Sequence, residues 1–407
     1  MSKIPKTAVQ SLPKSIIKAS IFFPSFLLGC LSIVATQLVG VFLFASDPST
    51  VQNFICLSKL HFIRLITFAT SFSSSADISI TYDTALLPSS NTFTVDNQGN
   101  IHSNFSPNSV FISNHQIYTD WMFLWFLNYT SKLGQYVFIV LKDQLSKLPV
   151  LGYGMKNYNF LFLSRKWEQD KVVIAKQLKM IDADAQGVGP SNGVKNKNDR
   201  PINNTVFPYQ LILYPEGTVP SDRTTKKSLE YTQFKKLPPL KHVLLPRTRG
   251  LFLVLRNLKD TVEVLYDITT GYSDLRTDEY GEDKFTLKNH YIWGQGPPKI
   301  NYHIKSYRIS EIPLGDLSVD IDDVKEVELQ AFEDWLLKVW YEKDARMEAF
   351  FRNGSFTDPI NPITTEKTVE GKLQLRNTFE VLTIFTTVGV VFSLLFVLLY
   401  VLKLFLF

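Results

Sequence analysis

Residues 110–123 of the chain read VFISNHQIYTDWMF, an apolar run followed by polar and aromatic residues. The apolar run VFIS predicts a buried strand over Val110–Ser113, and the residues after it predict a helix over Thr119–Thr130. His115 therefore lies at a strand-to-helix junction. In α/β sheets such junctions commonly carry the side chains that bind ligands.

His115 is the candidate general base of this junction, and Asp120 follows it five residues later. Positions i and i+5 do not share a helix face, so the two side chains can meet only if His115 lies in the loop and Asp120 in the first helical turn. The carboxylate would then accept the Nδ1 proton and leave Nε2 free to take a proton from a substrate hydroxyl. From spacing alone, Asp120 could equally be an acid that favours a helix N-terminus, with His115 as a structural residue.

A second strand ends in a comparable way at LYPEGT, residues 213–218, after the apolar run YQLIL. This pattern predicts a strand over Tyr209–Tyr214 with an acid and a glycine at its tip. Gly217 would let a ligand approach the backbone closely, and Glu216 could accept hydrogen bonds from a polyol or orient a cation. Taken alone, Pro-Glu-Gly is also an ordinary turn sequence.

Short β-rich runs alternate with helical patterns between about residues 75 and 356, which favours an α/β layer architecture. The further predicted strands are Tyr136–Leu141, Asn159–Leu163, His242–Leu245, Val262–Ile268 and Tyr302–Ile309, and the further predicted helices are Lys166–Ala185 and Asp322–Phe351. Residues 186–205 are rich in Gly, Asn and Lys and predict a flexible surface insertion.

Both ends of the chain contain segments that predict membrane helices. Residues 19–46 carry no formal charge, and this stretch is long enough to cross ~30 Å of hydrocarbon. Residues 381–402 are also uncharged, and with Lys403 they predict a C-terminal transmembrane helix. A second N-terminal stretch, residues 54–72, contains charged and histidine side chains, so it is either a helix half sunk in the membrane interface or the returning arm of a hairpin.

These patterns divide the chain into a basic tail, N-terminal membrane segments, an α/β domain with its insertion, a linker and a C-terminal span. The boundaries are 1–19, 20–74, 75–356 with the insertion 186–205, 357–380 and 381–403. The tail contains four lysines and no acid, so the positive-inside rule places the N-terminus in the cytosol. If residues 51–72 return or stay interfacial, the α/β domain is cytosolic too; otherwise it is luminal.

Composition excludes several classes of protein. A net charge of +5 on 407 residues is too small for a strongly charge-driven nucleic-acid binder. Two cysteines, Cys30 and Cys56, are too few for a disulfide framework, a Cys-rich zinc module or an iron–sulfur cluster. We therefore expect no nucleic-acid partner, no metal site and no bound cofactor.

The motif NHxxxxD at 114–120, followed by PEGT at 215–218, resembles the signature pair of the glycerolipid acyltransferase family, to which lysophosphatidic acid acyltransferases belong. The resemblance covers about residues 75–355. Residues 142–165, KDQLSKLPVLGYGMKNYNFLFLSR, and 244–250, LLPRTRG, are similar to two further family blocks. PRTRG, LYDITTGY and WYEKDARMEAFF most resemble the lysocardiolipin/lysophosphatidylinositol branch of fungal type. The resemblance implies an acyltransferase domain with a mixed sheet flanked by helices.

The resemblance also implies roles for individual residues. His115 would be the general base, Asp120 its orienter, and Arg165 the contact to the acceptor phosphate, which a guanidinium binds bidentately. The other substrate-binding candidates in the family blocks are Glu216, Gly217, Thr218, Asn114, Lys142, Pro246 and Arg247. Many members have Arg after PEGT, where Val219 stands here. One cationic contact is therefore expected to be missing, which favours a phosphodiester lysolipid over lysophosphatidic acid as acceptor.

The implied activity is direct acyl transfer from acyl-CoA, as a co-substrate, to a lysophospholipid hydroxyl without an acyl-enzyme. Lysophosphatidylinositol is the favoured acceptor, and lysophosphatidic acid and lysocardiolipin are the alternatives. A hydrolase would need a serine nucleophile on a strand–helix elbow, and the sequence has none in such a frame. A non-catalytic membrane lipid-binding scaffold is the remaining alternative. The resemblance implies an integral protein of the endoplasmic reticulum, and cytosolic acyl-CoA implies a cytosolic active site; no oligomeric state is predicted.

Overall fold

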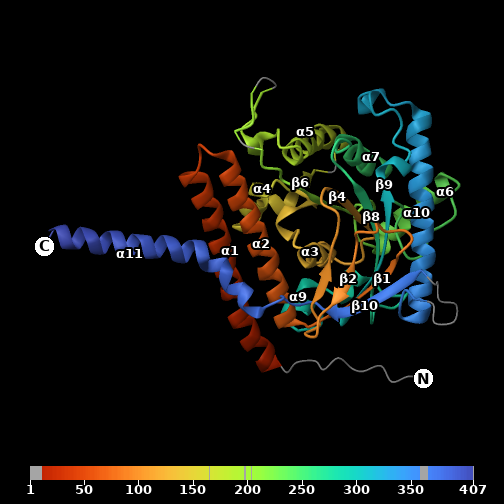
Figure 1. The fold of residues 1–407 in the computed structure, drawn as a ribbon. Helices are drawn as coiled ribbons and strands as arrows, with labels where there is room; N and C mark the ends of the chain where they lie inside the picture. The colour runs from red at the N-terminus through yellow and green to blue at the C-terminus, as the bar shows by residue number, and fades with distance from the viewer. Residues whose placement is uncertain (1–11, 165, 197–198, 203, 358–364, 407) are drawn as a thin grey trace.

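A mixed sheet forms the centre of the fold, which is described from a computed structural model for residues 12–164, 166–196, 199–202, 204–357 and 365–406 (Figure 1). The sheet has eight strands in the order β10-β1-β9-β8-β4-β7-β5-β6. Its strands are β1 (Asp77–Asp83), β4 (Ser109–Ser113), β5 (Val137–Lys142), β6 (Leu161–Leu163), β7 (Gln210–Leu213), β8 (Val264–Tyr272), β9 (Lys299–Arg308) and β10 (Glu366–Lys372). A separate antiparallel pair consists of β2 (Phe93–Val95) and β3 (Ile101–Ser103). The predicted α/β fold with a mixed sheet flanked by helices is confirmed.

The middle of the sheet is parallel, and this places the two motif loops together. β4 pairs in parallel with both β7 and β8, and β5 pairs in parallel with β7. The carboxyl ends of these strands therefore share one edge, where the NHxxxxD and PEGT loops begin.

The strands are buried on both faces because helices cover both sides of the sheet. Along β4, Val110 and Ile112 point into one core and Phe111 into the other. One face is covered by α2 (Pro48–Ser73) and α3 (Asp120–Thr130), and the other by α5 (Trp167–Ala185), α7 (Thr248–Asn257) and α10 (Glu326–Asn353). The remaining α-helices of the domain are α4 (Leu151–Asn157), α6 (Asp222–Phe234), α8 (Gly281–Lys284) and α9 (Leu287–Tyr291).

The N-terminal helices α1 (Leu12–Leu43) and α2 (Pro48–Ser73) form an antiparallel hairpin that packs against the domain, whereas α11 (Thr386–Leu406) projects away from it (Figure 1). Each of these three regions is long and apolar enough to cross a membrane. Residues 54–72 are thus the returning arm of a hairpin. Lys59 and His61 are buried within the protein, so they do not form the water-facing side that an interfacial helix would need.

The expected linker, residues 357–380, is corrected in part, because its residues 366–372 form β10, which pairs antiparallel with β1. The sequence EKTVEGK lacks an alternating apolar face, so hydrophobic periodicity gives no signal for this edge strand. After β10, Glu380 of η6 (Thr378–Phe385) accepts hydrogen bonds from Arg64 Nε at 3.0 Å and the Tyr129 hydroxyl at 2.7 Å. This segment therefore connects α11 to α2 and α3.

The predicted strand His242–Leu245 is wrong, because the backbone there makes a different set of hydrogen bonds. The N–H groups of Lys241, His242 and Val243 all donate to one oxygen of the Asp344 carboxylate on α10, at 3.0, 2.6 and 3.2 Å. Pro246 then follows with no N–H to give to a neighbouring strand.

The composition of the insertion 186–205 predicts a flexible loop, but its described part is held by hydrogen bonds to neighbouring helices. Ser191 donates both its backbone N–H and its hydroxyl to the Asp184 carboxylate, and its carbonyl accepts the Ser49 hydroxyl of α2. Asn192 is fully buried. The described part of the insertion is therefore attached to α5 and to the hairpin.

A buried ion pair joins α10 to the sheet and yields a stability prediction. Lys343 is fully buried and donates to Asp267 Oδ1 and to the Ile268 carbonyl, both at 2.6 Å. Burial alone would raise the pKa of Asp267, but the charges of Lys343 and Lys305 outweigh it and hold this pKa below its ordinary value.

Lys343→Ala is expected to destabilise the fold by about 3–5 kcal/mol, because a buried carboxylate would keep no closer cation than the Lys305 amine, at 3.8 Å. The midpoint of heat-induced unfolding in detergent, followed by tryptophan fluorescence, measures the effect. Lys338→Ala, an exposed lysine of the same helix, is the matched control. Equal midpoints for the two variants would contradict this account.

Candidate active site

His115 and Asp120 meet at the carboxyl end of β4. His115 Nδ1 lies 2.8 Å from Asp120 Oδ2, which also accepts the backbone N–H groups of Gln116 and Ile117 at 2.6 and 3.1 Å. A carboxylate accepts hydrogen bonds, so the ring N–H at Nδ1 donates to Asp120 and Nε2 is the nitrogen left to face a substrate. This is the arrangement that the five-residue spacing requires for the two side chains to meet.

The two members of this pair differ in their access to solvent. The His115 side chain is 16% exposed, whereas that of Asp120 is 2% exposed. One face of the imidazole stacks on the Tyr214 ring, with centroids 4.4 Å apart. Within the described part of the chain, no hydrogen bond engages Nε2. The geometry leaves this nitrogen available to a substrate and seals the carboxylate behind it.

Tyr272 supplies the other oxygen of Asp120 with a donor that sequence reasoning missed. Its hydroxyl donates to Asp120 Oδ1, and its side chain is buried. Burial and the charge of Asp120 raise the pKa of Tyr272 well above its ordinary value, so the hydroxyl stays protonated and keeps donating. The sequence offers one signal, since LYDITTGY is among the segments that resemble the family, but its place beside β4 comes from strand pairing.

Glu216 lies below the surface of the site, where acceptor binding was predicted for it. Its side chain is 2% exposed, and its two oxygens accept the backbone N–H of His115 and the indole N–H of Trp340, each at 3.3 Å. Burial raises the pKa of this carboxyl well above its ordinary value. Both oxygens of Glu216 are therefore engaged within the protein, and one of them supports the NHxxxxD loop. Trp340, on α10, is a second residue that the sequence did not identify.

Asn114, another predicted substrate contact, makes its hydrogen bonds to the backbone of the sheet. It is fully buried, and its amide binds both backbone groups of Thr270, at 2.9 and 2.8 Å. These two hydrogen bonds join the end of β4 to β8. The Asn114 side chain therefore fixes where the catalytic loop leaves the sheet.

A cationic side chain from another segment lies beside the PEGT turn. Val219 is buried and lies away from solvent. Gly217 adopts φ +71°, and a Cβ at this position would lie 3.3 Å from Arg247 Nε. The exposed Arg247 side chain thus packs over the PEGT turn, and its backbone N–H donates to the Pro215 carbonyl at 2.8 Å. Position 219 alone gives no sign that Arg247, 28 residues later in the chain, lies beside this turn.

The remaining candidates are distributed around the same edge. Thr218 is half-buried in the PEGT turn, and Pro246 is buried next to Arg247. Lys142 ends β5, with its amine 5.6 Å from the centre of the Tyr118 ring. Arg165 lies outside the described residues. Within the described ranges, no cluster of three His, Cys, Asp or Glu side chains is placed to hold a metal ion.

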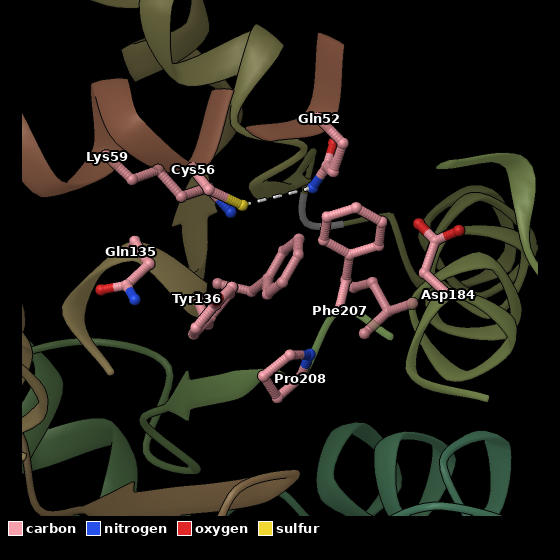
Figure 2. Close-up of a pocket in the computed structure, with 10 residues that line it drawn as sticks. Gln52, Cys56, Lys59, Gln135, Tyr136, Asp184, Phe207 and Pro208 are labelled. Carbon is pink, nitrogen blue, oxygen red and sulfur yellow. Dashed lines mark hydrogen bonds between the residues drawn. The ribbon is translucent and has the colours of Figure 1, made fainter. Parts of the chain in front are cut away.

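A small cavity beside α2 is separate from this site (Figure 2). Cys56 and Lys59 line it together with Tyr136 and Pro208, which precede β5 and β7. It therefore lies at the amino ends of the parallel strands, opposite the edge that carries His115. Its volume of about 10 Å³ is that of a single water site, and Cys56 has no place in the chemistry at the other edge.

The α/β fold, the membrane helices and the His–Asp pair together define the class of protein. A family model described as Acyltransferase matches residues 92–265, and the chain belongs to this family. It is 39% identical over 347 residues to the 2-acyl-1-lysophosphatidylinositol acyltransferase of Saccharomyces cerevisiae, covering 82% of this chain and 84% of the relative.

Two further relatives place the chain in the same branch. It is 31% identical over 354 residues to an uncharacterized acyltransferase of Schizosaccharomyces pombe, covering 87% of this chain and 90% of the relative. It is 28% identical over 247 residues to lysocardiolipin acyltransferase 1 of Danio rerio, covering 60% and 52%. The resemblance to the lysocardiolipin/lysophosphatidylinositol branch of fungal type is confirmed, and the chain is a membrane O-acyltransferase.

Tyr272→Phe is expected to lower kcat roughly 10-fold with KM unchanged, because a hydrogen bond to a charged group contributes about 1.5–3 kcal/mol and this one orients the base without touching substrate. Steady-state acyl transfer by the purified protein measures both constants. Tyr302→Phe is the matched control, since the buried Tyr302 hydroxyl has no hydrogen-bond partner among the described residues. A rise in KM at constant kcat, or the same loss in the control, would argue against a positioning role.

Proposed function

We propose that the protein transfers the acyl group of acyl-CoA to a free hydroxyl of a lysophospholipid, with lysophosphatidylinositol as its main acceptor. The observation that carries this proposal is the 2.8 Å contact of His115 Nδ1 with a sealed Asp120 carboxylate, which leaves Nε2 available in a member of the acyltransferase family. The name of the Saccharomyces cerevisiae relative supports the acceptor.

In the proposed reaction, His115 Nε2 takes the proton of the acceptor hydroxyl as its oxygen attacks the thioester carbonyl carbon. The tetrahedral intermediate collapses with cleavage of the C–S bond, and the CoA thiolate leaves and receives the proton from the imidazolium. Asp120 stabilises the imidazolium charge between these two steps. General base catalysis of this kind contributes roughly 10²–10⁴-fold.

Positive side chains at the same edge support a phosphate-bearing acceptor. Arg247 packs over the PEGT turn, and Lys142 ends β5 one strand away from β7. A guanidinium can bind two phosphate oxygens at once, while the amine acts as a point charge. By its resemblance to the family, Arg165 adds a third cation.

In this proposal the protein lies in the endoplasmic reticulum membrane, and its active site faces the cytosol. The α1–α2 hairpin brings the chain back to the side on which it enters, and the lysine-rich tail supports a cytosolic N-terminus. Acyl-CoA is made available on that side. Lysocardiolipin is the second acceptor to consider, because the name of the Danio rerio relative specifies it.

His115→Ala is expected to lose at least roughly 100-fold in activity, as removal of a general base predicts. Membranes with matched expression are assayed with labelled oleoyl- and stearoyl-CoA against the lyso forms of phosphatidylinositol, phosphatidic acid, phosphatidylcholine, phosphatidylserine and cardiolipin. His102→Ala is the control, because His102 is exposed and contacts Asp96 at 3.3 Å, away from the motif loops. Full activity of His115→Ala, or no transfer by the wild type, would refute the mechanism and favour a lipid-binding scaffold.

A further inference from the structure

An exposed aromatic residue lies in the catalytic loop, which is the NHxxxxD segment at residues 114–120. Tyr118 lies between His115 and Asp120 in the chain, and 47% of its surface is exposed. Its hydroxyl donates to Glu282 Oε2 at 2.6 Å, and the Lys142 amine lies 5.6 Å from its ring centre. An aromatic ring, a carboxylate and an amine from three segments of the chain therefore meet beside the proposed base.

The position of Glu282 is fixed by close packing on the catalytic loop. Gly281 precedes it, and a Cβ at Gly281 would lie 2.5 Å from Ile117 Cγ2 and 2.7 Å from the Gln116 carbonyl oxygen. Only glycine allows α8 to approach the loop this closely. The hydrogen bond to Glu282, together with burial, raises the pKa of Tyr118 to about 12, so the tyrosine remains the donor and the carboxylate the acceptor.

The same segment continues from the catalytic loop to the membrane hairpin. On α9, the Tyr291 ring stacks on Phe22 of α1, with centroids 5.5 Å apart, and its hydroxyl lies 3.0 Å from that of Thr70 on α2. Near this end Leu287 is exposed, and Trp293 lies on the same segment. Along this segment Glu282 thus lies between the contact with the NHxxxxD loop and the contact with the hairpin.

We propose that Tyr118, Glu282 and Lys142 form a headgroup-recognition rim that selects a hydroxyl-rich phosphodiester headgroup, such as inositol phosphate, over a phosphomonoester. The proposal rests on the acyl transfer proposed above and specifies how that site discriminates among acceptors.

Each side chain of the rim suits one feature of such a headgroup. The second oxygen of the Glu282 carboxylate can accept hydrogen bonds from ring hydroxyls. The exposed face of Tyr118 offers an apolar surface to the C–H groups of a cyclic polyol. Lys142 can pair with the single phosphate charge, whereas the second charge of a phosphomonoester would be repelled by Glu282.

A different headgroup chemistry could also use a carboxylate, because choline and ethanolamine carry a positive charge. Polyol recognition and cation recognition predict different effects on acceptor preference when the Glu282 charge is removed. If the rim binds polyols, Glu282→Gln weakens transfer to lysophosphatidylinositol and improves transfer to lysophosphatidic acid. If it binds cations, the largest loss falls on the lyso forms of phosphatidylcholine and phosphatidylethanolamine.

The test measures kcat/KM of the full-length protein in liposomes for lysophosphatidylinositol, lysophosphatidic acid and lysophosphatidylethanolamine. Glu282→Gln is expected to lower the ratio of the first to the second by at least about 10-fold. Tyr118→Phe should shift the ratio in the same direction, because Glu282 loses the donor that orients it. Asp283→Asn is the matched control: it removes an exposed neighbouring charge without a hydrogen bond to Tyr118.

Three outcomes would overturn the proposed rim: an unchanged ratio in Glu282→Gln, a uniform loss toward every acceptor, or an equal shift in Asp283→Asn. A selective contact must act on some headgroups more than on others. A dominant loss on lysophosphatidylethanolamine would replace polyol recognition by cation recognition and so overturn it as well. Absence of transfer by the wild type would contradict the proposed function, whereas wild-type transfer with an unaltered variant ratio would contradict this inference alone.

Discussion

Two buried carboxyl groups hold the NHxxxxD loop in place, and the rest of the site depends on them. Asp120 accepts two backbone N–H groups of the loop, the His115 imidazole and the Tyr272 hydroxyl, while Glu216 accepts the backbone N–H of His115 from the neighbouring strand end. Hydrogen bonds of this kind are strong in a buried setting because the donors and acceptors have no competing water. They fix the direction in which Nε2 points.

The supports of this loop reach the membrane helices through short connections. α3 begins at Asp120 and, near its end, places Tyr129 against Glu380, which also binds Arg64 of the hairpin. On the other side, the segment after β8 packs Gly281 on the loop and Tyr291 on α1. The catalytic loop is thus attached to the membrane segments on two sides, which suits a site that must meet an acceptor embedded in a bilayer.

Local pattern predicted the parts of the fold and the site that depend on nearby residues. The strand before His115, the His115–Asp120 spacing and the apolar helices all follow from sequence periodicity and length. The contacts of Tyr272 and Trp340 could not be predicted in this way, because strand pairing and the packing of α10 create them from segments more than a hundred residues away. The inward orientation of Glu216 is likewise set by burial in the folded chain, and β10 has no apolar alternation to reveal it.

We propose that Glu216 positions His115 and does not bind the acceptor. The most direct measurement is the steady-state kinetics of Glu216→Gln with lysophosphatidylinositol as the varied substrate. The amide has only one acceptor oxygen for two donors, His115 N–H and the Trp340 indole, so the loop loses one support. The account predicts that kcat falls roughly 10-fold or more while the acceptor KM stays within about 2-fold of wild type. A raised acceptor KM with unchanged kcat would contradict it and return Glu216 to the acceptor site.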